Sequence, residues 1–120
     1  MKKYLLVLVM ILSLTTTTHS QTLQNTYWRT YDYATNTPTD YLYFAQDTFW
    51  ASMNNINYDS LSVYTTNGNI FTIVDVVSGL CPLTDTGIYN FSISADTLRF
   101  NVMHDTCLGR NNYFHDHYYY

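Results

Sequence analysis

The sequence predicts an all-β domain, an antiparallel up-and-down meander of about eight strands that closes into a small barrel with one intramolecular disulfide. Three observations predict it. Thr, Tyr, Val, Ile and Phe, which suit a pleated surface, are abundant, whereas the helix formers Glu and Lys are absent after Ser20. Short apolar stretches recur between clusters of Asn, Asp, Gly and Thr, a spacing typical of sandwiches and barrels. Most connections between these stretches are too short to join anything but antiparallel strands.

The expected strands are justified in chain order by their turns and their apolar pattern. Gln46-Asp47 is expected to join the second strand to the third, and Asn67-Gly68 supplies the positive φ angles of the next hairpin. Residues 70–77 are nearly all apolar, so this strand should be covered on both faces. Ala95-Asp96 joins the two strands in which apolar and polar residues alternate most clearly. Three final tyrosines fit a last strand that closes the barrel. The expected strands are residues 27–33, 41–45, 48–53, 60–65, 69–77, 87–94, 97–103 and 113–119.

Residues 1–20 have the three parts of a secretory signal in order: a basic start, an apolar run over residues 4–14, and small residues at positions 18 and 20. A membrane anchor is the alternative, but a bilayer needs about 20 apolar residues and this run is shorter. The sequence therefore predicts a signal peptide over residues 1–20 and a barrel domain over residues 21–120. The product should be secreted or periplasmic, with no membrane attachment after cleavage.

Export changes the meaning of the two cysteines, because Cys81 and Cys107 would meet an oxidising environment in which thiols pair. A bridge across a loop of this length contributes about 3 kcal/mol by chain-entropy arguments. Two free buried thiols and an intermolecular bond are the alternatives. The even count and the export signal favour the intramolecular bridge.

The charge of the domain excludes several classes of partner. Within residues 21–120 all nine acids are Asp, and the bases are Arg29, Arg99 and Arg110. An anionic chain without a basic cluster is a poor candidate for binding nucleic acid or an anionic membrane. We therefore expect no nucleic-acid partner and no membrane partner. The sequence does not indicate an oligomeric state.

Residues 81–110 carry a pattern of known type. Cys81 is followed by Gly87-Ile88-Tyr89 at the start of a strand, by the hairpin Asp96-Thr97-Leu98, and by Asp105-Thr106-Cys107-Leu108-Gly109-Arg110. The pattern resembles the C-terminal half of small exported lipocalin-like (calycin-type) domains. The resemblance implies a lipocalin-like barrel in which an early Trp is covered by a late Arg, and Trp28 and Arg110 stand in those places.

Cation–π attraction of about 0.5–2 kcal/mol would make the pair of Trp28 and Arg110 structural. Asp105 is expected to cap a turn or to pair with an Arg.

Candidates for catalysis or metal binding are weak. His115 and His117 would share one face of a strand, as a two-histidine site requires, but a third ligand such as His104 cannot be placed beside them from the sequence. Solvent-facing histidines are the simpler interpretation. No nucleophile motif or glycine-rich phosphate loop is present in the sequence. We therefore expect no enzyme, no cofactor and no metal.

Aromatic residues make up 18% of the chain, more than one small core commonly uses. An eight-stranded barrel either is filled by side chains or holds one small ligand. Some aromatics should therefore line a pocket, with the alternative that they fill the barrel. The candidate pocket residues are Trp28, Tyr43, Trp50, Tyr89, Phe91, Phe100 and Tyr113.

Two functions follow from these alternatives. The first is a non-enzymatic exported barrel that binds a small apolar or aromatic ligand. The second is an extracellular protein–protein interaction module, an enzyme inhibitor or a cell-surface component, with a filled barrel and tyrosines displayed outward. An interior cavity of roughly 300 Å³ or more favours the first, and a filled interior favours the second.

Overall fold

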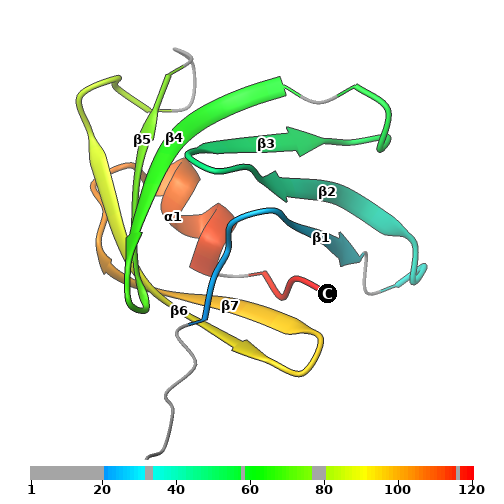
Figure 1. The fold of residues 1–120 in the computed structure, drawn as a ribbon. Helices are drawn as coiled ribbons and strands as arrows, with labels where there is room; N and C mark the ends of the chain where they lie inside the picture. Colours follow the sequence, from blue (N-terminus) through cyan, green and yellow to red (C-terminus); the bar gives the residue numbers. More distant parts are fainter. Residues whose placement is uncertain (1–20, 32–33, 58, 77–80, 116) are drawn as a thin grey trace, which may run out of the picture.

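The computed structural model describes residues 21–31, 34–57, 59–76, 81–115 and 117–120. Seven strands pair antiparallel in sequence order in one curved sheet, and a short helix follows them (Figure 1). The predicted all-β meander and nearly closed barrel are thus confirmed, while the expected signal peptide lies outside the described residues. The elements are β1 (Thr26–Tyr31), β2 (Pro38–Phe44), β3 (Thr48–Ser52), β4 (Asp59–Asn67), β5 (Ile70–Asp75), β6 (Thr86–Ser94), β7 (Thr97–His104) and α1 (Leu108–His115).

Tight turns set the register of the meander. Asn67 pairs with Ile70, so the β4–β5 turn consists of residues 68 and 69, one position later than expected. Gly68 supplies its left-handed conformation, with φ of 57°. Ala95 has φ of 51° in the predicted β6–β7 turn, an unusual conformation for a residue with a Cβ atom. Both hairpins bury one face of their strands, with Phe71, Phe91 and Phe100 pointing inward, whereas Val63 and Val102 lie exposed.

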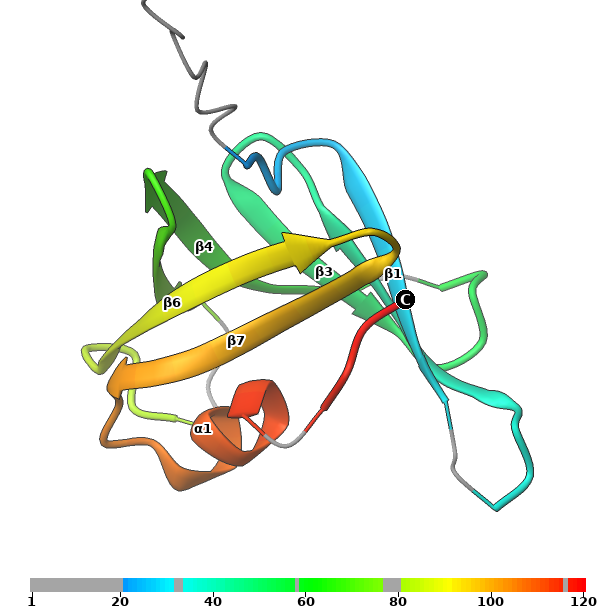
Figure 2. The same cartoon turned by 90° about the horizontal axis from the view of Figure 1, so that it is seen from below.

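Aromatic rings fill the space that the sheet encloses. Phe71, Phe100 and Phe114 are almost completely buried, and their ring centroids lie 4.9–5.6 Å apart. Such tilted and edge-to-face pairs are the geometry that aromatic side chains prefer. Phe114 comes from α1, which packs against β7 (Figure 2), so the helix places a ring in the barrel instead of covering its outside.

The expected strand over residues 113–119 is wrong at its start, because residues up to His115 belong to α1. Arg110 and Phe114 are the two buried residues of this helix. They are four positions apart and therefore share one face, which a strand would not give them. Burial of both side chains outweighs the poor helix propensity of the segment. No helix within the described ranges is long and apolar enough to cross a membrane.

The end of the chain closes the barrel in place of a full eighth strand. In a meander of seven strands β1 and β7 run in the same direction, so only a strand antiparallel to both can fill the seam between them. Tyr119 exchanges two backbone hydrogen bonds with Leu98 of β7, of 2.8 and 3.2 Å. Tyr120 exchanges two with Arg29 of β1, of 3.0 and 2.9 Å. Figure 2 shows this segment running from α1 to the side of β1.

A buried ionic cluster holds the opposite part of the barrel together. Arg110, only 4% exposed, donates from Nε and Nη2 to the two carboxylate oxygens of Asp105, at 2.7 and 2.9 Å. Its Nη1 lies 3.4 Å from Asp75, which also accepts a hydrogen bond of 2.7 Å from Ser62. Tyr89 donates its hydroxyl to Asp105. A buried charge is tolerated when it is paired and hydrogen-bonded in this way.

Asp105 organises this cluster in both of the predicted roles. It pairs with Arg110, and it accepts a hydrogen bond of 2.9 Å from the backbone N–H of Cys107 at the start of α1. Burial disfavours the charged carboxylate, but these donors and the Tyr89 hydroxyl outweigh burial and lower the pKa of Asp105. The predicted disulfide between Cys81 and Cys107 is confirmed, with Cα atoms 5.5 Å apart. The disulfide and the bonds of Asp105 thus hold the loop that carries Cys81, the start of α1 and the end of β7 together at one place.

Candidate binding site at the barrel seam

The structure does not gather the seven candidate pocket residues around one cavity. Tyr89, Phe91 and Phe100 are buried at 0–2% exposure and contact other rings of the core. Phe114 lies 5.2 Å from the ring of Tyr89 and 4.9 Å from that of Phe100. These three candidates are therefore core residues, in agreement with the alternative that aromatics fill the barrel.

Tyr43 and Trp50 lie on the outer face of the sheet. They pair with each other across β2 and β3, between positions whose side chains point inward, such as Phe44 and Phe49. The ring of Tyr43 stacks on that of Tyr27 in β1, with centroids 4.2 Å apart and planes 13° apart. These two rings cover each other, and neither Tyr43 nor Trp50 lines the groove described below, although Tyr27 does.

Trp28 and Tyr113 lie between these two groups, partly buried against the core. Trp28 donates its Nε1–H to the hydroxyl of Thr26, at 2.8 Å. Tyr113 packs edge-to-face on Phe114, and its carbonyl accepts the hydroxyl of Tyr119 at 2.6 Å. Of the seven candidates, Trp28 is the one that reaches the hollow described next.

An open groove of about 980 Å³ follows the seam where the terminal segment meets β1. Beside it, Tyr119 and Tyr120 of the terminal segment pair with Leu98 of β7 and Arg29 of β1. One wall is β1, another is the β6–β7 turn, and the terminal segment forms the third. The lining residues are Tyr27, Trp28, Arg29, Thr30, Tyr31, Asn36, Ala95, Asp96, His117, Tyr118 and Tyr120.

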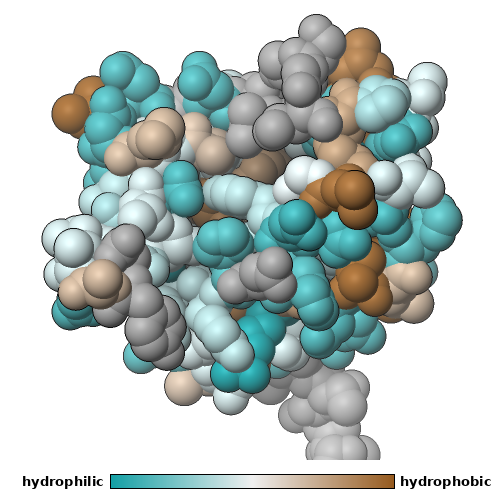
Figure 3. Space-filling model, turned by 180° about the vertical axis from the view of Figure 1, so that it is seen from behind, coloured by the Kyte–Doolittle hydropathy of each residue, from teal (hydrophilic) through white to brown (hydrophobic). Residues whose placement is uncertain are grey.

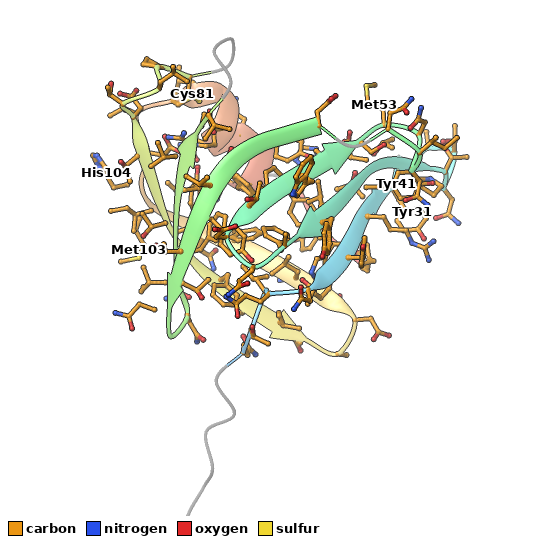
Figure 4. The ribbon with its side chains drawn as sticks, turned by 45° about the horizontal axis from the view of Figure 1, so that its top comes forward. Tyr31, Tyr41, Met53, Cys81, Met103 and His104 are labelled. Carbon is orange, nitrogen blue, oxygen red and sulfur yellow. A yellow bond between two sulfur atoms is a disulfide. The ribbon has the colours of Figure 1, made fainter. Side chains whose placement is uncertain are left out.

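Aromatic side chains gather at one end of this groove. Figure 4 labels Tyr31, which lines the groove, at the end of the barrel far from Cys81. Tyr27 is 67% exposed and Tyr120 is 49% exposed, although both are large. The face seen from behind in Figure 3 differs, since its hydrophobic side chains are scattered among hydrophilic ones. Exposed aromatics that lie together are typical of recognition surfaces.

The groove is also flanked by positive charge on an otherwise anionic domain. The guanidinium of Arg29 lies 5.1 Å from the ring centre of Tyr31, and that of Arg99 lies 4.4 Å from that of Tyr118. Both arginines are exposed, whereas Arg110 is buried and paired. The exposed arginines of the described chain therefore lie on the two strands that border the seam.

The expected stacking of Arg110 on Trp28 is wrong. All three guanidinium nitrogens of Arg110 face oxygen atoms of Asp105, Asp75 and the Asp85 backbone. Two buried carboxylates attract a guanidinium more strongly than an indole face does, which explains the difference. Among the described residues Trp28 has no cation partner, and its place beside the seam leaves its ring partly exposed.

The histidines do not form a metal site within the described part of the chain, where no group of three metal-ligating side chains is found. His115 ends α1 and His117 follows it, so they do not share a strand face as expected. His117 hydrogen-bonds through Nδ1 to the carbonyl of Tyr113, at 2.8 Å. Figure 4 places His104 beside Met103 on β7, away from Tyr31 and Tyr41.

Tyr119 is the buried anchor of the terminal segment. Its side chain is 0% exposed and its ring lies 5.9 Å from that of Phe100 and 6.4 Å from that of Tyr113. Burial raises the pKa of both Tyr119 and Tyr113, so each hydroxyl stays neutral and can donate a hydrogen bond. The segment is therefore held by one inward ring and four backbone bonds.

Sequence reasoning missed most of the groove. Arg29 and Tyr31 were counted as strand residues, and Tyr118 and Tyr120 as the end of a closing strand. The expected strands already put seven before the tail, which leaves the first and the last of them parallel with the tail between them. What the sequence did not signal is that residues up to His115 are helical, so that Tyr119 and Tyr120 make the pairs at the seam.

Comparison with protein-family models, with curated proteins and with solved structures finds no match for the chain. The resemblance of residues 81–110 to lipocalin-like domains therefore stays a prediction.

Proposed function

We propose that the protein is an exported, non-enzymatic interaction module that binds a partner protein in the groove at the barrel seam. The observation that carries the proposal is the contrast between the two spaces of the barrel. The interior holds the packed rings of Phe71, Phe100 and Phe114, whereas the hollow at the seam is open and lined by aromatic side chains. A surface site fits this arrangement better than an internal ligand site.

The residues of the groove suit protein recognition. Tyr and Arg are enriched at the centres of protein interfaces, because each offers a large contact area and directed hydrogen bonds. Tyr27, Arg29 and Tyr31 come from one strand and therefore have a fixed spacing. The cation–π contact between Arg29 and Tyr31 restrains two side chains before binding, which lowers the entropy lost on association.

Export is part of the proposal. The disulfide between Cys81 and Cys107 favours an oxidising compartment, in agreement with the signal expected over residues 1–20. A small apolar molecule in the barrel is the competing proposal, and the packed rings of Phe71, Phe100 and Phe114 in the interior speak against it.

An apolar fluorescent probe separates the two proposals. With N-phenyl-1-naphthylamine, an interaction module should give no fluorescence enhancement and no rise of the melting temperature, whereas a carrier should give both. Cross-linking in the extracellular fraction then tests the groove itself. Capture of a partner should be lost in a double variant, Arg29→Ala with Tyr31→Ala, and kept in Met103→Ala, a matched exposed change on β7. Equal capture by both variants would contradict the proposal.

A further inference from the structure

The terminal segment, residues 117–120, occupies a place that could hold a longer strand. β1 has six residues and β7 has eight, yet the segment pairs with one residue of each, Arg29 and Leu98. Within the described chain, the other residues of β1 and β7 that face the seam have no backbone partner in the terminal segment. Strand edges that keep unpaired backbone groups are sites at which another strand can add.

The unpaired edge continues into the groove. The N–H and C=O of Arg29 both point to the seam, where Tyr120 binds them. Because alternate residues of a strand direct their backbone groups to the same side, those of Tyr27 point to the seam as well. Across the groove from Tyr27 lie Ala95 and Asp96 of the β6–β7 turn, with open space between. A segment that continues past the position of Tyr120 would therefore run along this free edge.

The seam also contains a pocket for one inward side chain. Tyr119 fills it completely, touching Phe100 and Tyr113 and donating its hydroxyl to the Tyr113 carbonyl. The hydroxyl bond favours tyrosine over phenylalanine in this pocket, since phenylalanine would lose this bond and leave His117 as the remaining side-chain partner of the carbonyl. Neighbouring residues of the segment, Tyr118 and Tyr120, keep their rings partly exposed. The pattern accepted by the seam is thus an extended backbone with one buried tyrosine.

We infer that the seam is a strand-addition site for an extended segment of a partner protein that carries a tyrosine at the place of Tyr119. Residues 117–120 are the internal occupant, and the partner's segment displaces them. The inference rests on the proposed function and names the class of partner.

Charge favours a foreign segment over the tail of a second copy, because the outward tail residues Tyr118 and Tyr120 carry no negative charge to pair with Arg29 and Arg99. A longer segment also pairs with Tyr27, and its outward side chains meet Arg29 and Arg99, which favour aromatic or acidic residues.

Synthetic peptides and the unaltered chain give the first test. A labelled peptide of the tail sequence His-Asp-His-Tyr-Tyr-Tyr, and the same peptide lengthened by Thr-Val-Thr, are titrated against the protein by fluorescence anisotropy. The longer peptide should bind about tenfold more tightly, because it adds bonds along β1. Replacing its middle tyrosine by alanine should abolish binding. In nuclear magnetic resonance spectra the bound peptide should shift the amide signals of Tyr27, Arg29 and Leu98.

A second experiment removes the tail side chain that competes with the peptide for the pocket. Tyr119→Ala in the full chain empties the pocket and should raise the affinity for both peptides about tenfold over the unaltered chain. If this variant does not fold, the titration of the unaltered chain decides alone.

Three results would overturn the inference: equal affinity for both peptide lengths, binding that ignores the middle tyrosine, or unmoved signals at Tyr27, Arg29 and Leu98. Exchange of tails between isotope-labelled copies, seen as mixed dimers in native mass spectra, would also overturn it and assign the seam to a second copy. If neither peptide binds but the double variant Arg29→Ala with Tyr31→Ala still loses capture of the partner protein, strand addition is wrong and the proposed interaction module is retained. If capture is also unaffected, both proposals are wrong.

Discussion

The ionic cluster around Arg110 and the seam around Tyr119 close the same barrel by different means. At the cluster, a buried guanidinium meets two carboxylates and a backbone carbonyl beside a disulfide, and Tyr89 donates its hydroxyl to one of these carboxylates. At the seam, four backbone bonds and one buried ring hold a short segment between two strands. Each contact of the cluster fixes the others, whereas the seam depends on a segment that pairs with one residue on each side.

This difference predicts that one region determines the stability of the barrel and the other determines binding. Regions with many mutually supporting buried contacts open only with the whole protein, and regions with few open locally. Binding surfaces are drawn from the second kind, because a partner must find unpaired groups or displace weakly held ones. The cluster should therefore dominate unfolding, and the seam should dominate recognition.

The largest effect is expected when the guanidinium of the cluster is removed. Arg110→Ala leaves the buried carboxylates of Asp105 and Asp75 without their cation and should destabilise the fold by about 3–5 kcal/mol. Urea unfolding followed by circular dichroism measures it. Arg99→Ala, an exposed arginine, is the matched control. A loss of less than about 1 kcal/mol for Arg110→Ala would show that the cluster is not the main anchor.

Removal of the disulfide should come next. Replacing Cys81 and Cys107 together by serine frees the loop between them and should lower stability by about 3 kcal/mol. The same urea titration, with mass spectrometry to confirm the bridge in the unaltered chain, measures the change. An unchanged midpoint would indicate that the cluster alone fixes the start of α1.

A single methyl group at Gly87 should disturb the cluster. A Cβ atom there would lie 2.5 Å from Oδ2 of Asp105 and 2.9 Å from Nε of Arg110, atoms that are locked together. Gly87→Ala should therefore cost about 1–3 kcal/mol, as overpacking of a core does. Gly68 has open space around it and is the contrasting glycine, although its positive φ makes substitution costly for another reason. Wild-type stability of Gly87→Ala would mean that the cluster can shift.

Alkaline pH should unfold the barrel through its buried tyrosines. Burial and the charge of Asp47 raise the pKa of Tyr64 to about 12, above its usual value near 10. Because the folded pKa is the higher one, the contribution to stability is complete below pH 10 and is lost as the pH rises toward 12. The urea midpoint measured from pH 9 to 12 should fall over this window, and less so in Tyr64→Phe. A midpoint that stays level to pH 12 would contradict this assignment.

The smallest effect on stability is expected at the seam. Arg99→Ala removes one exposed cation–π contact with Tyr118 and should cost less than about 1 kcal/mol. If Arg99→Ala also weakens binding of the longer peptide, the seam contributes to recognition more than to stability. A loss as large as that of Arg110→Ala would place the main anchor at the seam instead.

The sequence predicted the sheet well because its signals are local. Turn residues such as Gly68 and the alternation of apolar residues in β6 and β7 depend only on neighbours in the chain. The disulfide followed from the expected compartment and the even cysteine count. These features do not depend on how distant parts pack.

The helix and the groove depend on distant contacts and were missed for that reason. Arg110 and Phe114 form a helical face only because Asp105 and the aromatic core lie where they do. The resemblance to lipocalin-like domains implied Trp28 as the partner of Arg110, and no local signal in the sequence tells a buried carboxylate from an exposed one. Seven expected strands also precede residue 113, so the strand count before the tail was right. What the sequence did not show is that residues 108–115 form a helix, which leaves Tyr119 and Tyr120 as the residues that pair at the seam.

Native-state hydrogen exchange of the unaltered protein tests most directly whether the seam opens independently of the barrel. The amides of Arg29 and Leu98 bond to the terminal segment, and the amide of Phe91 in β6 bonds to the carbonyl of Asn69 in the β4–β5 turn. We predict that the first two exchange about a hundredfold faster or more, with opening free energies well below that of global unfolding, and that the longer peptide slows them. Equal protection of all three amides, unaffected by the peptide, would contradict the account.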